Sequence, residues 1–154
     1  IKNVFSIWDK YKDKKSAQLI FCDMSTPSSD FNIYDDIKTK LIDMGVPENE
    51  IEFIHKAKNN MEKDAIFDKV RKGEIRVLIG STQKMGAGTN AQDKLIAIHD
   101  LDIPWRPADL SQRAGRIVRQ GNENKKVYIF RYITENTFDA YLFQTLENKQ
   151  KYRN

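Results

Sequence analysis

The sequence lacks the features of disulfide-bonded secreted proteins and of membrane proteins. It has one cysteine, Cys22, which cannot form a disulfide within the chain, and its apolar neighbours predict a buried thiol in a reducing compartment. No apolar run reaches the roughly 18 residues that a membrane span requires, and residues 1–9 lack the apolar core of a signal peptide. We therefore expect a soluble, cytoplasmic protein without a membrane partner.

Motifs for metal binding and nucleophilic catalysis are also missing. The two histidines, His55 and His99, have no cysteine or carboxylate cluster at ligand spacing, so we predict no metal site. No Gly-Lys-Ser/Thr triplet follows a glycine-rich loop, which excludes a Walker A motif. Asp100 and Asp102 form a close acidic pair, but no histidine or serine motif accompanies them, and hydrolase chemistry of their own fits poorly.

Length and charge indicate one domain that could accept nucleic acid as a partner. A chain of 154 residues with 40% hydrophobic residues can bury one core and is too short for two ordinary domains. The net charge of +4 permits nucleic-acid binding without indicating it. We expect a single domain over residues 1–154, and the start at Ile1 in place of methionine fits a piece of a larger protein.

Short apolar runs rich in Ile, Val and Phe alternate with segments of helical period. This order predicts an α/β fold with a mainly parallel central sheet flanked by helices in three layers. Helices are expected over residues 33–42 and 61–72, each followed by a glycine, and at about 137–151. Residues 10–15 are interpreted as a solvated helix end or linker. The expected strands are 18–22, 51–55, 76–80, 95–99 and 126–132.

The segment 110–119 carries arginines at helical spacing. At 100° per residue an apolar face would lie opposite a polar face, with Arg113 near the boundary in a supporting role at most. Two guanidiniums beside an amide suit a polyanion such as a triphosphate or a nucleic-acid backbone, although a solvated basic helix face fits the spacing equally well. The apolar face would hold Leu110, Ala114, Ile117 and Val118, and the polar face Gln112, Arg116 and Arg119.

Residues 81–90 combine small polar residues with glycines directly after an expected strand. Gly86 and Gly88 allow positive φ and close approach to a ligand, while the hydroxyls of Ser81 and Thr82 can donate to phosphate. Ligands of parallel α/β folds bind beyond the carboxyl ends of the strands. The loop is therefore a candidate phosphate site, with a plain tight turn as the alternative.

Together these segments resemble the C-terminal, second RecA-like domain of superfamily 2 helicases. The run from Ser81 to Asn90 resembles motif V, and Gln112-x-x-Gly-Arg116-x-x-Arg119 resembles motif VI. Residues 18–23 take the place of motif IV. The order and separation of the motifs match as well, and the resemblance covers nearly the whole chain.

Within that superfamily the spacing resembles Snf2-type translocases. Asp102-x-x-Trp105-x-Pro107 ahead of motif VI is similar to their Trp-Asn-Pro element, although Arg106 replaces the usual Asn and Gly115 replaces a common Asp. Trp105 could stack on a base, or it could set the entry angle of the arginine helix. Residues 126–154 resemble the helicase part of large helicase–methylase proteins of phages and mobile elements.

The resemblance implies ATP hydrolysis by a longer protein. ATP would lie between this lobe and a first RecA-like lobe of the same polypeptide, which would hold most of the Mg²⁺ ligands; the present chain alone would be inactive. Arg116 and Arg119 would be arginine fingers, with Gln112, Gly88 and Asn90 near the nucleotide. Double-stranded DNA is the expected track. Its phosphates would contact Ser81, Thr82 and Lys84, although Lys84 could instead be an ordinary exposed lysine.

Two alternatives remain open from the sequence. A degenerate RecA-like module could bind nucleic acid or a protein without coupling to ATP. A free-standing α/β enzyme could have a small-molecule site of its own, although no nucleophile or phosphate-binding motif supports it.

Overall fold

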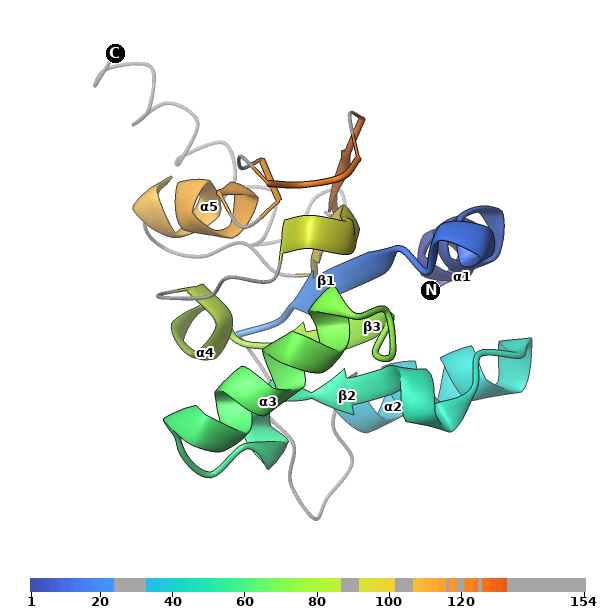
Figure 1. Cartoon of the computed structure of the whole chain (residues 1–154), viewed down its shortest axis with the longest axis horizontal. Helices are drawn as coiled ribbons and strands as arrows, with labels where there is room; N and C mark the ends of the chain where they lie inside the picture. Colours follow the sequence, from blue (N-terminus) through green and yellow to red (C-terminus); the bar gives the residue numbers. More distant parts are fainter. Residues whose placement is uncertain are drawn as a thin grey trace, which may run out of the picture.

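A parallel sheet forms the centre of the molecule (Figure 1). The computed structural model describes residues 1–23, 33–86, 92–101, 107–115, 117–118, 121–124 and 126–132. Within them, five strands form one parallel sheet in the order β2-β3-β1-β4-β5, which confirms the predicted α/β fold. The strands are β1 (Ala17–Phe21), β2 (Ile51–Phe53), β3 (Val77–Gly80), β4 (Leu95–Asp100) and β5 (Tyr128–Arg131).

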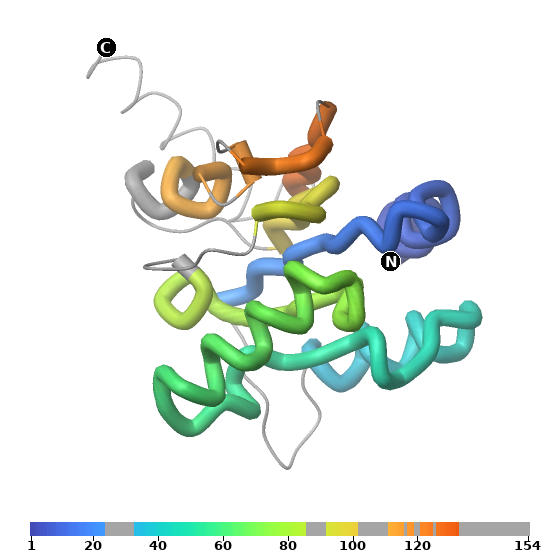
Figure 2. The backbone as a smooth tube through the Cα atoms, in the orientation of Figure 1, coloured from blue at the N-terminus to red at the C-terminus, as the bar shows by residue number. Residues whose placement is uncertain are grey.

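Helices cover both faces of the sheet, as Figures 1 and 2 show. On one face, α1 (Lys2–Lys10) and α2 (Ile33–Met44) pack in a core that contains Ile20 of β1. On the other, α3 (Asn60–Arg71) and α4 (Thr82–Gly86) pack in a core that contains Leu19. Neighbouring residues of β1 are thus buried in the cores on opposite faces of the sheet. This explains why the central strands are continuous apolar runs in the sequence. The remaining helix, α5 (Pro107–Ala114), contacts α4.

The predicted helices over 33–42 and 61–72 are confirmed. Helix α3 begins after Asn59, whose side chain accepts a hydrogen bond from the Glu62 amide at 2.9 Å, the usual role of an N-cap. It is followed by Gly73 with a φ of +81°, where a side chain would be strained. Residues 10–15 form the end of α1 and a short 3-10 turn whose lysines are exposed, as expected.

The arginine-bearing helix is shorter at its carboxyl end than predicted. Helix α5 begins at Pro107, a favoured first position, and ends at Ala114, before Gly115. The Ala114 carbonyl accepts from the amides of both Ile117 and Val118 at 3.1 Å, so the chain turns there. Ile117 is buried as expected, but Val118 is 63% exposed, because the helical period does not continue through the turn.

Residues 82–86 form a helical turn where a loop was expected. The Ser81 carbonyl accepts from the Met85 amide at 3.0 Å, and the Ser81 hydroxyl accepts from the Lys84 amide at 3.2 Å. Met85 is fully buried and anchors this turn in the core. The expected loop over 81–90 is therefore wrong for its first part, and residues 87–91 lie outside the described residues.

The carboxyl ends of neighbouring strands lie together at one edge of the sheet. Phe21 of β1 pairs with Gly80 of β3 and with Asp100 of β4, and Asp100 pairs with Arg131 of β5. Because the strands are parallel, the segments that follow β1, β3 and β4 start at this one carboxyl edge. None of the helices in the described part of the chain is long and apolar enough to cross a membrane.

Candidate functional site

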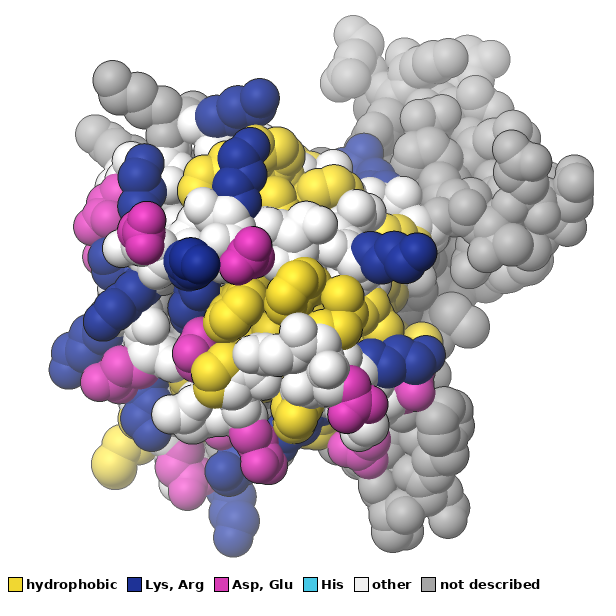
Figure 3. Space-filling model, turned by 90° about the vertical axis from the view of Figure 1, so that its right-hand side faces the viewer, with side chains coloured by type: hydrophobic (Ala, Val, Ile, Leu, Met, Phe, Trp, Pro, Cys, Tyr) yellow, Lys and Arg dark blue, Asp and Glu magenta, His cyan; other side chains and the backbone are white. Residues whose placement is uncertain are grey.

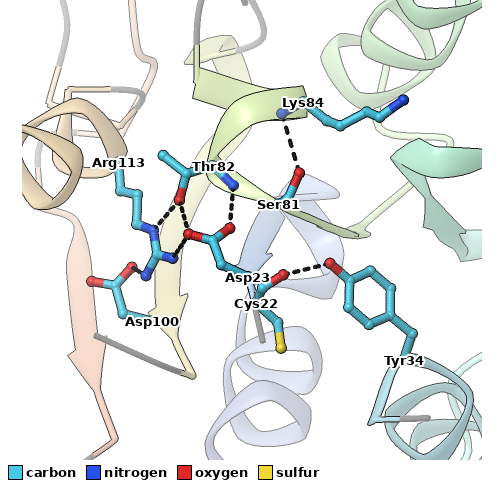
Figure 4. A network of polar contacts seen from close by, with 8 residues as sticks. All are labelled: Cys22, Asp23, Tyr34, Ser81, Thr82, Lys84, Asp100 and Arg113. Carbon is cyan, nitrogen blue, oxygen red and sulfur yellow. Dashed lines mark hydrogen bonds and ion pairs between the residues drawn. The ribbon is translucent and has the colours of Figure 1, made fainter. Parts of the chain in front are cut away.

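Two segments that are distant in the sequence are joined at the carboxyl edge by Asp23 and Thr82 (Figure 4). Asp23 follows β1, and Thr82 is the first residue of α4. One carboxylate oxygen of Asp23 accepts from the Thr82 amide at 2.7 Å, and the other accepts from the Thr82 hydroxyl at 2.8 Å. Helix α4 is thereby held against the end of β1.

Arg113 of α5 extends this contact into a network. Its Nε donates to the Thr82 hydroxyl at 2.7 Å and its Nη2 to Asp23 at 2.9 Å. Its Nη1 donates to Asp100 at 3.3 Å, and Arg131 lies 3.5 Å from the other oxygen of that carboxylate. We call these five residues the Arg113 network. They link α4, α5 and the ends of β1, β4 and β5.

Arg113 and Asp100 form the buried part of the Arg113 network, whereas Asp23 and Arg131 are about one-third exposed. The Arg113 side chain is fully buried, with its guanidinium carbon 5.2 Å from the centre of the Phe21 ring. Burial raises the pKa of Asp100, while the positive charges of Arg113 and Arg131 act in the opposite direction. A buried guanidinium is stable only when its donors are matched by acceptors, and here all three nitrogens have one.

The predicted nucleic-acid contacts lie at the start of α4. Ser81 is partly exposed and Lys84 is exposed, whereas Thr82 is buried and uses its hydroxyl proton on Asp23. The Lys84 charge contributes to lowering the pKa of both His55 and Lys63, although burial is the larger cause in each case. Basic groups from η3 (Ile54–Lys56) and α3 therefore gather near α4.

The predicted nucleotide contacts are only partly within the described structure. Gln112 lies on α5, next to Arg113, and its side chain is partly exposed. The other predicted contacts and the C-terminal helix at about 137–151 lie outside the described residues, so those predictions stay predictions. The residues concerned are Gly88, Asn90, Arg116 and Arg119, together with Trp105.

From the sequence, Arg113 was assigned too small a role and Asp23 was not singled out. Asp100 was considered only as part of an acidic pair with Asp102. Arg113 was expected near the boundary of a longer helix, yet it is the most completely buried charge of the site. A signal was available, because Asp23 and Asp100 stand at the ends of apolar strands that share one edge of a parallel sheet. Acids in that position need a buried cation, and a nearby arginine is the usual partner.

The acidic side chains of the site do not form a metal-binding cluster with other ligands in the described part of the chain. Within the described ranges, no group of three or more His, Cys, Asp or Glu side chains could hold a metal ion. The acids of the Arg113 network are paired with arginines, an arrangement that suits an anion-binding edge better than a cation site.

The opposite edge of the sheet has a different character. Figure 3, which views that side of the molecule, shows lysine and arginine side chains intermixed with acidic ones around an apolar area. A pocket of about 380 Å³ lies at this amino edge, next to Ser16 and Lys94, which precede β1 and β4. Its lining carries both signs of charge, so it selects neither an anion nor a cation. The lining residues are Asp13, Lys14, Lys15, Ser16, Lys94, Glu123 and Asn124.

Comparison with known proteins points to one family. The family described as helicase conserved C-terminal domain matches residues 3–121. The chain is 33% identical over 79 residues to the Defense against restriction protein B of Escherichia phage P1, covering 51% of this chain and 4% of that protein. It is 39% identical over 88 residues to the uncharacterized ATP-dependent helicase YqhH of Bacillus subtilis (strain 168), covering 57% of this chain and 15% of that protein.

A solved structure supports the same fold. The C-terminal part of the Fun30 ATPase domain superposes with a TM-score of 0.70 at 22% identity, covering 93% of this chain and 43% of that one. At this identity the likeness concerns the fold alone. The alignments span only 4% and 15% of the lengths of the two sequence relatives.

Proposed function

Because the chain belongs to the family of helicase conserved C-terminal domains, we propose that it is the second RecA-like lobe of an ATP-dependent helicase or translocase. The observation that carries the proposal is the attachment of α5 and α4 to one carboxyl edge by Arg113 and Thr82. In parallel α/β folds this edge is where ligands bind. ATP would lie between this lobe and a first lobe of the same polypeptide, which would hold most of the Mg²⁺ ligands.

The nucleotide side of the proposed site is α5 and the residues after it. Gln112 orients the bound phosphates, and Arg116 and Arg119 act as arginine fingers, with Gly88 and Asn90 toward the nucleotide. When ATP is bound, its terminal phosphoryl group is transferred to water, and fixed guanidiniums stabilise the charge that develops.

The charge balance of the edge supports a polyanion there. Asp23 and Asp100 are already paired with Arg113 and Arg131. Arg116 and Arg119 would bring further positive charge to this edge, which suits a triphosphate.

The nucleic-acid side of the proposed site is the start of α4. Ser81 and Lys84 contact backbone phosphates, and the neighbouring Lys63 adds a second positive charge. Thr82 contacts a phosphate only if its hydroxyl exchanges its bond to Asp23 for one to the strand. Double-stranded DNA is the proposed track.

The test is nucleic-acid-stimulated ATP hydrolysis by the full-length protein. Arg116→Ala and Arg119→Ala should each lower the rate by ~10³- to 10⁵-fold, the range seen for arginine fingers, and leave DNA affinity unchanged. Arg71→Ala is the matched control, because Arg71 lies in the last turn of α3 and pairs with Asp68, away from the carboxyl edge. That variant should hydrolyse ATP at the wild-type rate.

Other outcomes would point to a different function. If the wild-type protein does not hydrolyse ATP, or if both arginine variants retain full activity, the motor proposal fails. The chain would then be a RecA-like module that binds nucleic acid or a protein without coupling to ATP.

A further inference from the structure

Arg113 of α5 is a buried cation that bonds to a second helix and to the ends of two strands. It belongs to α5, and its Nε donates to Thr82 at the start of α4, while Asp23 accepts from both residues. The three side chains form a closed triangle, in which each is bonded to the other two (Figure 4). Arg113 and Thr82 are buried, and about one-third of the Asp23 side chain is exposed.

The two helices joined by this triangle carry different ligands in the proposed function. Ser81 and Lys84, on the nucleic-acid side, flank Thr82 within three residues. Gln112, on the nucleotide side, directly precedes Arg113. A displacement of the start of α4 by a bound strand must therefore stretch or move the bond between Thr82 and Arg113.

The chemistry of the triangle favours discrete positions. A guanidinium is planar and presents its donors in a fixed fork, so Arg113 cannot follow Thr82 without changing its bonds to Asp23 and Asp100. Burying these charges costs desolvation energy that a packed apolar group of similar volume would avoid. The network therefore adds little net stability to the fold, and its fixed geometry suits a role in positioning α5 relative to α4.

We propose that Arg113, held by Asp23, is the positioning residue that couples nucleic-acid binding at α4 to ATP hydrolysis at α5. This inference rests on the proposed function. The bonds of Arg113 to Thr82 and Asp23 set the position of α5, and the strand at α4 changes that position. Coupling between the two binding steps is reciprocal, so nucleotide changes the affinity for DNA by the same factor as DNA changes the affinity for nucleotide.

The experiment compares Arg113→Lys and Asp23→Asn with the wild-type full-length protein. Lysine keeps the charge but cannot bond to three acceptors in one plane, and asparagine places a donor where Asp23 now accepts. The ATPase rate is measured with and without double-stranded DNA, and DNA affinity is measured with and without a non-hydrolysable ATP analogue. Folding is checked by circular dichroism and thermal unfolding.

Beyond any fall in the DNA-free rate, the stimulation by DNA should fall by about tenfold in both variants, which is within the usual range of coupling between sites. The change in DNA affinity that the ATP analogue causes should also become smaller. Arg76→Lys is the matched control, because Arg76 is also buried and donates to the carbonyls of Ser16 and Trp8, away from this edge. It should lower thermal stability and leave the stimulation factor unchanged.

The inference is overturned if Arg113→Lys and Asp23→Asn lower the DNA-free and DNA-stimulated rates in equal proportion, or if Arg76→Lys loses as much stimulation as they do. Arg113 would then be only a structural residue. If Arg113→Lys does not fold, Asp23→Asn decides the matter, because Asp23 is one-third exposed and tolerates change better. A wild-type protein without DNA-stimulated hydrolysis would instead overturn the proposed function itself.

Discussion

Gln18 on β1 and His99 on β4 are joined across the sheet by a hydrogen bond of 2.6 Å between Oε1 and Nε2. The Gln18 amide nitrogen already donates to the Val4 carbonyl, so the Gln18 oxygen accepts and His99 carries its proton on Nε2. The other ring nitrogen, Nδ1, then accepts from the Tyr132 hydroxyl at 2.7 Å. One neutral tautomer of His99 therefore satisfies this buried group of side chains.

The burial of neutral His99 predicts a loss of stability in acid. Burial lowers the pKa of His99 from 6.5 to about 3. Below pH 6.5 the unfolded chain binds a proton that the folded chain does not, so the free energy of unfolding falls as the pH drops from 6.5 toward 3. His99 contributes at most about 1.4 kcal/mol per pH unit to this slope, which urea unfolding at several pH values measures.

Two glutamine variants separate His99 from the other histidine. His99→Gln keeps hydrogen-bonding groups but cannot titrate, so its stability should depend less on pH than that of the wild type. His55→Gln should have a smaller effect, because His55 is only partly buried; burial and the Lys84 charge lower its pKa as well. An unchanged slope in the His99→Gln chain would show that the acid sensitivity has another source.

Removal of Arg113 should destabilise the fold strongly. Arg113→Ala leaves Asp100 buried without its main partner and Asp23 without its ion pair, and breaking such pairs from one side costs about 3–5 kcal/mol. Arg131→Ala removes the more exposed partner of Asp100 and should cost less than about 1 kcal/mol. Urea unfolding of both variants measures the difference, and equal losses would contradict the dominant role assigned to Arg113.

Lys84 should contribute to DNA affinity through charge alone. Lys84→Ala should weaken binding equally for different DNA sequences. The slope of log affinity against log salt concentration should become smaller in magnitude by about 1. Lys72→Ala is the control, because Lys72 is an exposed lysine just after α3 that pairs with Asp68. Binding titrations over a range of salt concentrations distinguish the two, and equal slopes for both variants would remove Lys84 from the interface.

The same substitution has a readout that does not require DNA. The Lys84 charge lowers the pKa of His55, so Lys84→Ala should raise it, whereas Lys72→Ala should leave it unchanged. Titration of the histidine ring protons by NMR measures this shift. No shift in the Lys84→Ala chain would mean that the two groups lie farther apart in solution.

The strands were predictable because each is a short apolar run buried on both faces. Residues such as Leu19 and Ile20 serve opposite cores, so the pattern shows no polar alternation and its length alone marks the strand. The helix at 110–119 was less predictable, because its apolar period continues past Gly115 while the backbone turns there. Local spacing could not show that Val118 would point to solvent.

The amino-acid sequence was enough to predict the succession of strands and helices along the chain, and with it the edge at which Ser81, Gln112 and their neighbours gather. This follows from periodicity, since apolar spacing sets which face of each element is buried. The partners of Arg113 are visible only in the folded protein, where it bonds to Asp23, 90 residues away, and to Thr82 and Asp100. Such pairing depends on which strand ends lie side by side. The order β3-β1-β4 arises from crossover connections, which local sequence patterns do not predict.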